Sequence, residues 1–307
     1  MDYNKIILGK NKQYVYLCDY NQILNREMEE YFLESSKHKK IEVRDVHITP
    51  GLIKEKLKLL NHVIFEVTEN CNLRCKYCVF NGEYINQRPF STKPMSFKTA
   101  KLALDRVYHY ISERDNRELY LGFYGGEPFL NVKLIKQIVD YAGSLFAGWE
   151  VKYNLTTNLT LLTDEILDYL IENKFRILVS LDGPGNNHDA KRVFPDGSGS
   201  FDIVCKNLRK IKEKNSDYFG EKVTFSTVFS PDLPLEKLYD FFSDDDLVNR
   251  NSMRLSSVNP YDTTYFEKYP YDKNELRGKN ENIIKKMKGK KKEGKDLSKI
   301  ESILLRN

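Results

Sequence analysis

The sequence contains no long apolar run. No stretch of about 18 consecutive apolar residues occurs, so we expect no transmembrane helix. The first residues, MDYNKIILGKNK, carry neither the apolar core nor the small-residue cleavage site of a secretory signal. These absences predict a cytoplasmic protein without a membrane partner.

Cysteine is scarce and unevenly placed. The chain has 5 cysteines, an odd number, and three of them fall within the stretch CNLRCKYC that begins at residue 71. An odd, clustered set makes a poor disulfide framework, and in a reducing compartment such a cluster is typical of metal binding. Cys18 and Cys205 lie within apolar stretches and are predicted to be packed core thiols. Cys71, Cys75 and Cys78 are therefore the candidate metal ligands.

Outside its C-terminal end the sequence also lacks excess positive charge. The formal net charge is +5, and residues 271–307 alone contain 12 Lys+Arg against 6 Asp+Glu. A lysine run such as KKMKGKKKEGK is more often solvated than part of a binding surface. We therefore expect no nucleic-acid partner, and we interpret residues 261–307 as a basic C-terminal segment that is partly disordered or truncated.

What the chain does contain is a repeated strand and helix pattern. Its 307 residues, 40% of them hydrophobic, suffice for one large domain or two modest ones. Apolar runs predict strands, and amphipathic stretches predict helices with Ser96 and Thr163 as N-caps. The predicted strands are 62–67, 118–125, 149–157, 175–181, 222–229 and 253–258, and the predicted helices are 96–111, 131–146, 163–174, 200–214 and 235–243. This alternation predicts a parallel sheet over residues 61–260, either an open doubly wound sheet or a barrel.

The unusual motifs all follow predicted strands. The cysteines come after the first strand, GGEP after the second, TTN after the third, and SLDGP ends the fourth. In a β/α barrel the carboxyl ends of the strands converge on the face where active sites are built. The order of the motifs therefore predicts one site on one face of the sheet.

Residues 1–60 are predicted to form a small separate α+β unit. Strands are expected in KIILG and QYVYLCD, and a helix in NREMEEYFLESS. Such a unit could recognise a peptide by adding it to a sheet edge. An extension that packs against the open edge of the barrel is an equal alternative.

A motif of three cysteines suits an iron-sulfur cluster better than zinc. A structural zinc site takes four ligands, typically in two close pairs, and the sequence offers no second pair. A cubane cluster that only transfers electrons also takes four cysteines, whereas a cluster held by three keeps one iron open to a substrate or cofactor. We expect Tyr77 to shield such a cluster from water. Zinc with a fourth ligand from elsewhere and a set of buried thiols are the alternatives.

Taken together, the motifs resemble those of a known enzyme family. TENCNLRCKYC, GFYGGEP, TTNLTLLTDE, SLDGP followed by HDAKR, and GSGSFD are similar to motifs of the radical S-adenosylmethionine enzymes, in particular the SPASM-type maturases of peptides and sulfatases. The resemblance covers residues 62–258 well and residues 1–60 weakly. It implies a partial (β/α)6 barrel of the radical SAM type, a [4Fe-4S] cluster on Cys71, Cys75 and Cys78, and S-adenosyl-L-methionine as the cofactor. It also implies a reducing electron donor such as flavodoxin or ferredoxin.

The resemblance further implies a reaction. One electron from the cluster would cleave S-adenosylmethionine to methionine and a 5′-deoxyadenosyl radical, which abstracts hydrogen from a peptide or protein substrate. Thioether formation at a peptide cysteine is the first hypothesis, and formylglycine formation by a sulfatase-type maturase is the second. No cysteine follows Cys205, so the family's cysteine-rich C-terminal domain has no counterpart. A truncated remnant that binds peptide or cluster without turnover is therefore the third hypothesis.

Gly125, Gly126, Glu127 and Pro128 form the GGEP motif at the end of the second predicted strand. The two glycines lack side chains, which would let the backbone approach a ligand closely, and Pro128 stiffens the turn. The resemblance implies that Glu127 contacts the ammonium group of the cofactor. The alternative is an ordinary turn from strand to helix.

Three further positions are candidate cofactor contacts. Ser180 and Asp182 lie two residues apart, so in a strand both face the same side and would reach the cofactor's carboxylate and ribose; the alternative is a solvated DGPG turn. Asn158 follows the third strand, but Leu159 stands where the family usually has glycine. Because leucine resists a positive φ, we expect an altered turn and a displaced Asn158.

His188 and Arg192 lie in GPGNNHDAKRVF, a loop that resembles the family's own. Arg192 could pair with a carboxylate of the cofactor or substrate. A surface salt bridge is the alternative.

Overall fold

The computed structural model describes residues 5–8, 13–17, 22–25, 48–292 and 300. The chain divides between Glu55 and Lys56 into two compact units, and each is described by itself. The first contains an antiparallel sheet of β1 (Lys5–Leu8), β2 (Gln13–Leu17) and β3 (Gln22–Asn25) in the order β1-β2-β3. The first two strands fall in the predicted runs, whereas β3 was not predicted. The helix predicted over residues 25–36 lies outside the described residues.

An unpredicted helix, α2 (Pro50–Leu57), follows this sheet in the chain. The backbone N–H of Leu52 donates to Oγ1 of Thr49 over 3.2 Å, so Thr49 acts as the N-cap. Pro50 occupies the first helical position, where its missing N–H costs nothing.

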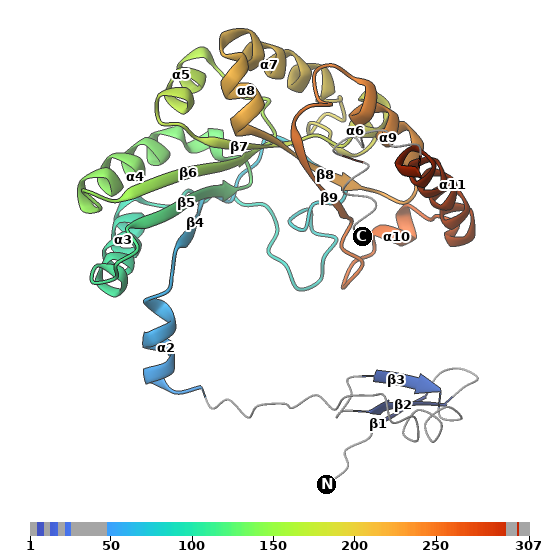
Figure 1. Ribbon diagram of the computed structural model, residues 1–307, viewed down its shortest axis with the longest axis horizontal. Coiled ribbons are helices and arrows are strands. Elements are labelled where there is room, and N and C mark those ends of the chain that lie inside the picture. The colour runs from blue at the N-terminus through green and yellow to red at the C-terminus, as the bar shows by residue number, and fades with distance from the viewer. Residues whose placement is uncertain (1–4, 9–12, 18–21, 26–47, 293–299, 301–307) are drawn as a thin grey trace. The chain divides into compact units, whose positions relative to one another are not determined.

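The second unit is built on a six-stranded parallel sheet (Figure 1). Its strands are β4 (His62–Thr68), β5 (Glu118–Gly125), β6 (Glu150–Thr157), β7 (Arg176–Ser180), β8 (Val223–Phe229) and β9 (Ser252–Ser257). Its helices are α3 (Phe97–Ile111), the 3-10 helix η3 (Pro128–Asn131), α4 (Val132–Leu145), α5 (Asp164–Glu172), α6 (Gly185–Lys191), α7 (Phe201–Lys214), α8 (Ser216–Lys222), α9 (Leu235–Asp244), α10 (Tyr265–Lys268) and α11 (Lys273–Lys292).

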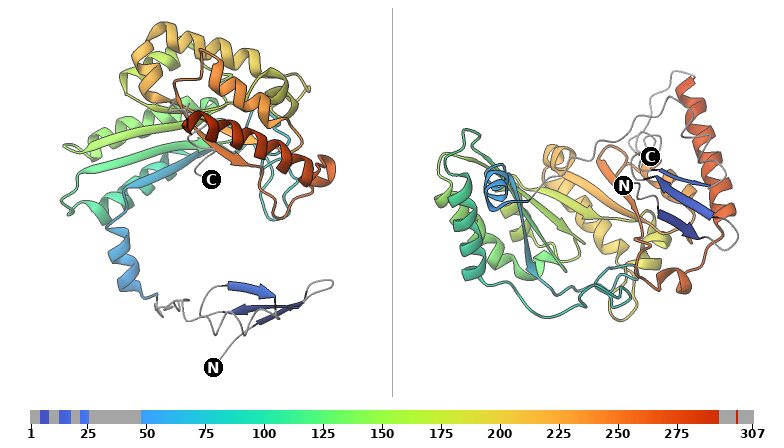
Figure 2. Two further views of the ribbon diagram at one scale, coloured as in Figure 1. Left: turned by 45° about the vertical axis from the view of Figure 1, so that its right-hand side comes forward. Right: turned by 90° about the horizontal axis from the view of Figure 1, so that it is seen from below.

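The strand order decides between the two predicted architectures. Every strand pairs with its predecessor in the chain, in the order β4-β5-β6-β7-β8-β9, and β4 and β9 are the two ends of the sheet. A doubly wound sheet would reverse this order at a switch point and carry helices on both faces. Here the sheet is curved and the helices cover its convex side (Figures 1 and 2). The predicted partial (β/α)6 barrel is confirmed.

Side chains alternate between the two faces of the sheet. Those on the helix-covered face form the core, and they include Phe65, Val67, Leu119, Leu121, Phe123, Leu155, Ile177, Val179, Val223 and Phe225. On the other face, Ile64 is 63% exposed and Tyr124 is 46% exposed. The predicted N-caps are also present, because Ser96 Oγ accepts from Thr99 N–H and Thr163 Oγ1 accepts from Ile166 N–H.

The lysine-rich C-terminal segment contains an ordered part. Residues 273–292, within the segment interpreted as partly disordered or truncated, form α11, a polar helix of 20 residues. Ile283 and Met287 lie one turn apart and are buried in the core, which explains why a sequence so rich in lysine is ordered. No helix within the described ranges is both long enough and apolar enough to cross a membrane.

Candidate active site

A cavity of about 300 Å³ lies where the carboxyl ends of the strands meet the cysteine motif. This volume is at the lower end of the range for small-molecule sites. Most of the residues predicted for the site line it, namely Cys71, Cys75, Cys78, Gly125, Gly126, Asn158, Ser180 and Arg192. Glu127, Pro128 and Asp182 do not. The sequence therefore located the site but did not give the orientation of every side chain.

The loop that carries the cysteines is held by backbone hydrogen bonds. Arg74 N–H donates to the carbonyl of Val193 over 2.7 Å, and Lys76 N–H donates to the carbonyl of Lys191 over 2.9 Å. Lys191 is itself anchored, because its buried ammonium pairs with Asp232 at 2.7 Å and lies 3.4 Å from the ring centroid of Tyr269. The end of α6 and the residues directly after it therefore anchor the cysteine loop.

The three thiols share a partly buried setting. Burial raises the pKa of the Cys71 thiol to about 11 and that of the Cys75 thiol to about 12. The pKa of Cys78 is raised as well, again chiefly by burial. Thiols in this state hold their protons at neutral pH, so a metal that binds here must displace them.

The arrangement of the thiols fits a cluster better than a single ion. Among the described residues, no three Cys, His, Asp or Glu side chains converge as the ligands of one metal ion would. The thiols of Cys71, Cys75 and Cys78 instead line one cavity wall. Cysteines that hold a cubane cluster each bind a different iron and need not converge on one point. The donor set and its spacing therefore fit a [4Fe-4S] cluster.

Gly125 and Gly126 are needed for the packing of the chain itself. A Cβ atom on Gly126 would lie 2.0 Å from the carbonyl oxygen of Asn70, and one on Gly125 would lie 2.3 Å from that of Thr68. The backbone N–H of Gly126 donates to Thr68 and that of Glu127 donates to Asn70. The end of β5 therefore docks directly on the residues that lead into Cys71.

The Glu127 side chain is turned into the protein. Its carboxylate is 1% exposed and accepts hydrogen bonds from Thr157 Oγ1 (2.7 Å), Asn158 N–H (2.7 Å) and Phe129 N–H (3.1 Å). It therefore ties β5 to the end of β6 and caps η3, which begins at the buried Pro128, and it does not face the cavity. Burial raises the pKa of Glu127 to about 7.

Leu159 differs from the expectation that leucine would resist a positive φ. It adopts a φ of +61° despite its side chain. The Leu159 side chain is fully buried, and that burial, about 1.5–3 kcal/mol, offsets the left-handed backbone, which costs about 1–2 kcal/mol. Asn158 lines the cavity, with Nδ2 3.9 Å from Sγ of Cys71 and 2.9 Å from Oδ1 of Asn72.

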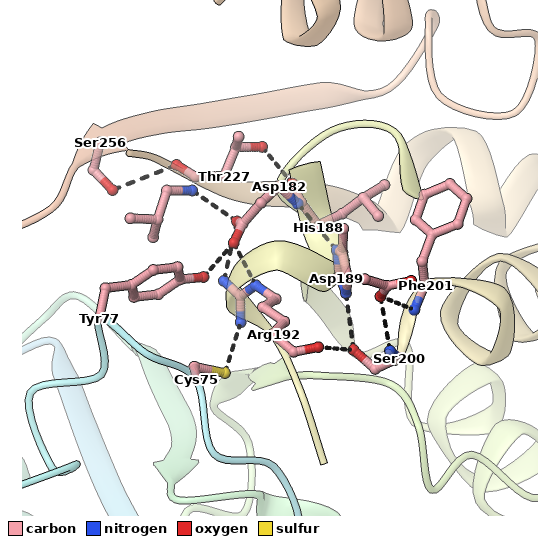
Figure 3. Close-up of polar contacts among 12 residues, drawn as sticks. Cys75, Tyr77, Asp182, His188, Asp189, Arg192, Ser200, Phe201, Thr227 and Ser256 are labelled. Atoms are coloured by element: carbon pink, nitrogen blue, oxygen red, sulfur yellow. Dashed lines mark hydrogen bonds and ion pairs between the residues drawn. The ribbon is translucent and has the colours of Figure 1, made fainter. Parts of the chain in front are cut away.

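Asp182 and Arg192 form a buried ion pair beside the cavity (Figure 3). Nε of Arg192 donates to Oδ2 of Asp182 over 2.8 Å, and Nη2 donates to Oδ1 over 3.2 Å. Asp182 also accepts from the Tyr77 hydroxyl and from Val228 N–H, so its oxygens are engaged within the protein. Burial alone would lower the pKa of Arg192, but Asp182 holds it well above the usual range. Arg192 is therefore not in the surface salt bridge considered as an alternative.

Several lining residues were not predicted. Tyr124, Thr156, Thr157 and Ser257 lie at the carboxyl ends of strands, whereas Ser226 lies in the middle of β8. The rule that placed Ser180, that polar residues at the carboxyl end of a barrel strand face the site, would have found the first four. The aromatic residues Phe80, Tyr84 and Phe90 come from the loop after the cysteines, for which the sequence gave no such signal.

A short clasp lies beside the cavity, which Tyr84 lines. It joins the loop after the cysteines, residues 83–86, to residues 262–268 beyond the last strand. Ile85 N–H donates to the carbonyl of Asp262 over 3.0 Å, and Thr264 Oγ1 donates to Glu83 over 3.0 Å. Lys268 pairs with the same Glu83 carboxylate. This clasp holds Tyr84 and Val258 in the cavity wall.

The fold and the site define a radical SAM protein. Residues 65–244 match the family described as the Radical SAM superfamily, and the chain belongs to it. The matched range runs from within β4 to the end of α9 and includes the cysteine loop.

The relatives include maturation enzymes, as the resemblance implied. The chain is 28% identical over 242 residues to the radical SAM cyclopropyl synthase TigE of Paramaledivibacter caminithermalis, covering 76% of this chain and 48% of that protein. It is 27% identical over 195 residues to a cysteine-type anaerobic sulfatase-maturating enzyme of Clostridium novyi, covering 62% of this chain and 50% of that protein. The chain spans about half the length of these curated relatives.

A solved structure shares the fold. The enzyme anSMEcpe, in a structure with bound AdoMet, superposes with a TM-score of 0.61 at 20% sequence identity, over 78% of this chain and 63% of that one. At this identity the likeness concerns the fold alone.

Proposed function

We propose that this chain binds a [4Fe-4S] cluster and S-adenosylmethionine, and that it modifies a peptide by radical chemistry. One observation carries the proposal. The thiols of Cys71, Cys75 and Cys78 line the same cavity as the backbone of Gly125 and Gly126 and the side chains of Asn158, Ser180 and Arg192. A reducing cytoplasm and an electron donor such as flavodoxin or ferredoxin are part of the proposal.

Each of the residues at the site has a proposed role. A bound, reduced cluster would supply the electron for cleavage of S-adenosylmethionine to methionine and a 5′-deoxyadenosyl radical. The three cysteines would hold the cluster, and the positive charge of Arg192, whose Nε and Nη2 bind Asp182, would attract the cofactor's carboxylate. Peptide groups of Gly125 and Gly126, and not the inward-turned Glu127 carboxylate, would meet its ammonium group. Ser180 would add a hydroxyl contact, and Phe80 and Phe90 would exclude water from the radical.

The substrate class follows from the relatives and stays a proposal. TigE is named a cyclopropyl synthase, and the matched solved structures include anSMEcpe with a bound Cp18Cys peptide. We propose a peptide substrate, with thioether formation at cysteine as the first reaction to test. Formylglycine formation is the second candidate, supported by the similarity to cysteine-type sulfatase-maturating enzymes. A chain that binds peptide or cluster without turnover is the third.

The test is anaerobic reconstitution with iron and sulfide, followed by reduction in the presence of S-adenosylmethionine. We expect a [4Fe-4S] absorbance and EPR signal, and formation of 5′-deoxyadenosine. Cys75→Ala should lose both. Cys205→Ala is the matched control, because Cys205 is buried in α7 and does not line the cavity; it should lose neither.

The outcomes separate the candidates. Loss of the nucleoside product in Cys75→Ala with retention in Cys205→Ala supports a working radical core. Cysteine-containing peptides would then be screened by mass spectrometry, where a loss of two hydrogens indicates a thioether and conversion of cysteine to formylglycine indicates the second candidate. A wild-type protein that binds the cluster but forms no 5′-deoxyadenosine would contradict the proposed activity.

A further inference from the structure

Two of the candidate cluster ligands, Cys71 and Cys75, have different polar surroundings. Sγ of Cys71 accepts from the backbone N–H of Leu73 over 3.4 Å and lies 3.9 Å from Nδ2 of Asn158, so its donors are neutral. Sγ of Cys75 lies 4.0 Å from Nη1 of Arg192, which is a full positive charge. The guanidinium is also 5.3 Å from the ring centroid of Tyr77. The charge near Cys75 is thus separated from bulk water by buried side chains.

Asp182 fixes the position of this charge. Two nitrogens of Arg192 bind the two oxygens of one carboxylate, a fork that allows a single orientation of the guanidinium. Val228 N–H donates to Oδ1 of Asp182 over 2.8 Å, and the Tyr77 hydroxyl donates to Oδ2. With these bonds made, Nη1 is the guanidinium nitrogen that faces Cys75 (Figure 3).

A closed ring of hydrogen bonds supports the Asp182–Arg192 ion pair. The backbone N–H of Asp182 donates to Nδ1 of His188 over 3.3 Å, and Nε2 of His188 lies 3.0 Å from Oγ of Ser200. Ser200 Oγ in turn donates to the carbonyl of Arg192 over 2.8 Å. Since Nδ1 accepts, Nε2 carries the proton, and the imidazole is neutral. The ring therefore adds rigidity to Arg192 without adding charge.

We propose that this ring, through Arg192, sets the reduction potential of the cluster on Cys71, Cys75 and Cys78; the inference rests on the cluster of the proposed function. Reduction adds one negative charge to the cluster. A fixed cation beside one of its sulfur ligands stabilises the reduced form and raises the potential, whereas the Asp182 carboxylate behind it acts in the opposite direction. His188 and Ser200 are positioning residues that act through Arg192.

Substitutions of Arg192 and of Asp182 should shift the reduction potential of the cluster in opposite directions. The reconstituted protein is titrated anaerobically without S-adenosylmethionine, and the reduced cluster is counted by EPR. In Arg192→Gln we expect the ratio of reduced to oxidised cluster at a fixed solution potential to fall about tenfold. For a one-electron couple this is a shift of the reduction potential by about 59 mV to a more negative value. In Asp182→Asn the shift should be positive, because the amide keeps the shape and removes the negative charge.

Arg176→Gln is the control, because it removes one positive charge, as Arg192→Gln does. Arg176 is exposed at the opposite end of β7 from the cavity and does not line it, so its removal should leave the potential unchanged. An equal shift in Arg176→Gln would mean that net charge alone matters and would overturn the inference. So would shifts of the same sign in Arg192→Gln and Asp182→Asn.

The experiment also separates this inference from the proposed function. A wild-type protein that takes up no cluster would overturn both. A wild-type protein with a cluster whose potential is the same in Arg192→Gln would overturn the inference alone. If Arg192→Gln takes up no cluster, Asp182→Asn decides, and a negative shift or none overturns the inference.

Discussion

Leu159 combines a left-handed backbone with a fully buried side chain. We expect Leu159→Ala to lower the free energy of unfolding by about 2–5 kcal/mol, because the buried side chain is lost and the unfavourable φ stays. Leu159→Gly should be about 1 kcal/mol more stable than Leu159→Ala, since glycine adopts a φ of +61° without strain. Urea denaturation of the two variants measures the difference.

Leu155 provides the matched control for this comparison. It is equally buried in β6, and its φ is not positive. There glycine should be the less stable replacement, by about 0.5–1 kcal/mol. The same order at both sites would contradict the account of the Leu159 turn.

Two buried titratable residues predict opposite dependences of stability on pH. Burial lowers the pKa of His188 from 6.5 to about 3, so its contribution is present above pH 6.5 and is lost as the pH falls toward 3. Burial raises the pKa of Glu127 from 4.5 to about 7, so its contribution is present below pH 4.5 and is lost as the pH rises through 7. Between pH 4.5 and 6.5 the two slopes, each up to about 1.4 kcal/mol per pH unit, should largely cancel.

Single variants separate the two slopes. In Glu127→Gln the free energy of unfolding should rise with pH between 4.5 and 6.5, because only His188 still contributes there. In His188→Asn it should fall over the same interval. Denaturation of the cluster-free protein across this range tests both signs, and other titrating groups cancel in the comparison with wild type. Parallel curves for all three proteins would contradict the assignment.

At the level of single residues, the sequence predicted which residues lie at the site better than it predicted the direction in which their side chains point. The cysteine spacing and the position of motifs at strand ends were enough to place Cys71, Cys75, Cys78 and Ser180 around one cavity. Some partners of Glu127 and Asp182 are distant in the chain: Thr157 is 30 positions from Glu127, and Tyr77 is 105 positions from Asp182. No local pattern indicates whether a carboxylate faces a ligand or these distant donors, so the sequence could not decide it.

Among the elements, those with a continuous apolar pattern were predicted well. Strands β4 to β9 and helices α3, α4, α5, α7 and α9 lie within a few residues of their predicted bounds. Helices α6, α8 and α10 are short, at 7, 7 and 4 residues, and their sequences are polar or aromatic without helical periodicity. They form because the tertiary structure provides contacts for them, which a local pattern does not contain.

Helix α11 tests how a lysine-rich segment becomes ordered. We expect Met287→Ala to lower the free energy of unfolding by about 2–5 kcal/mol, because Met287 is fully buried. The neighbouring Lys288 is exposed, and Lys288→Ala should change stability by less than about 0.5 kcal/mol. Equal, small effects in denaturation experiments would mean that the helix does not pack on the core.

For the molecule as a whole, the site depends on the docking of the cysteine loop onto the sheet. A methyl group at Gly126 would meet the Asn70 carbonyl at 2.0 Å, so Gly126→Ala should cost about 1–3 kcal/mol and lower the iron content after reconstitution. Gly143 lies within α4 with nothing near its Cβ position. Gly143→Ala should raise stability by about 0.5–1 kcal/mol and leave the iron content unchanged. Normal iron content in Gly126→Ala would contradict the role of this docking.

The clasp also orders events during synthesis on the ribosome. Glu83, which follows the cysteines closely, bonds to Thr264 and Lys268, which are 181 and 185 residues further along the chain. At translation rates of about 5–20 residues per second, the cysteines precede this wall of their cavity by roughly 10–40 s. During that interval the nascent cysteine loop lacks this wall, which forms only when the last strand and α10 are in place.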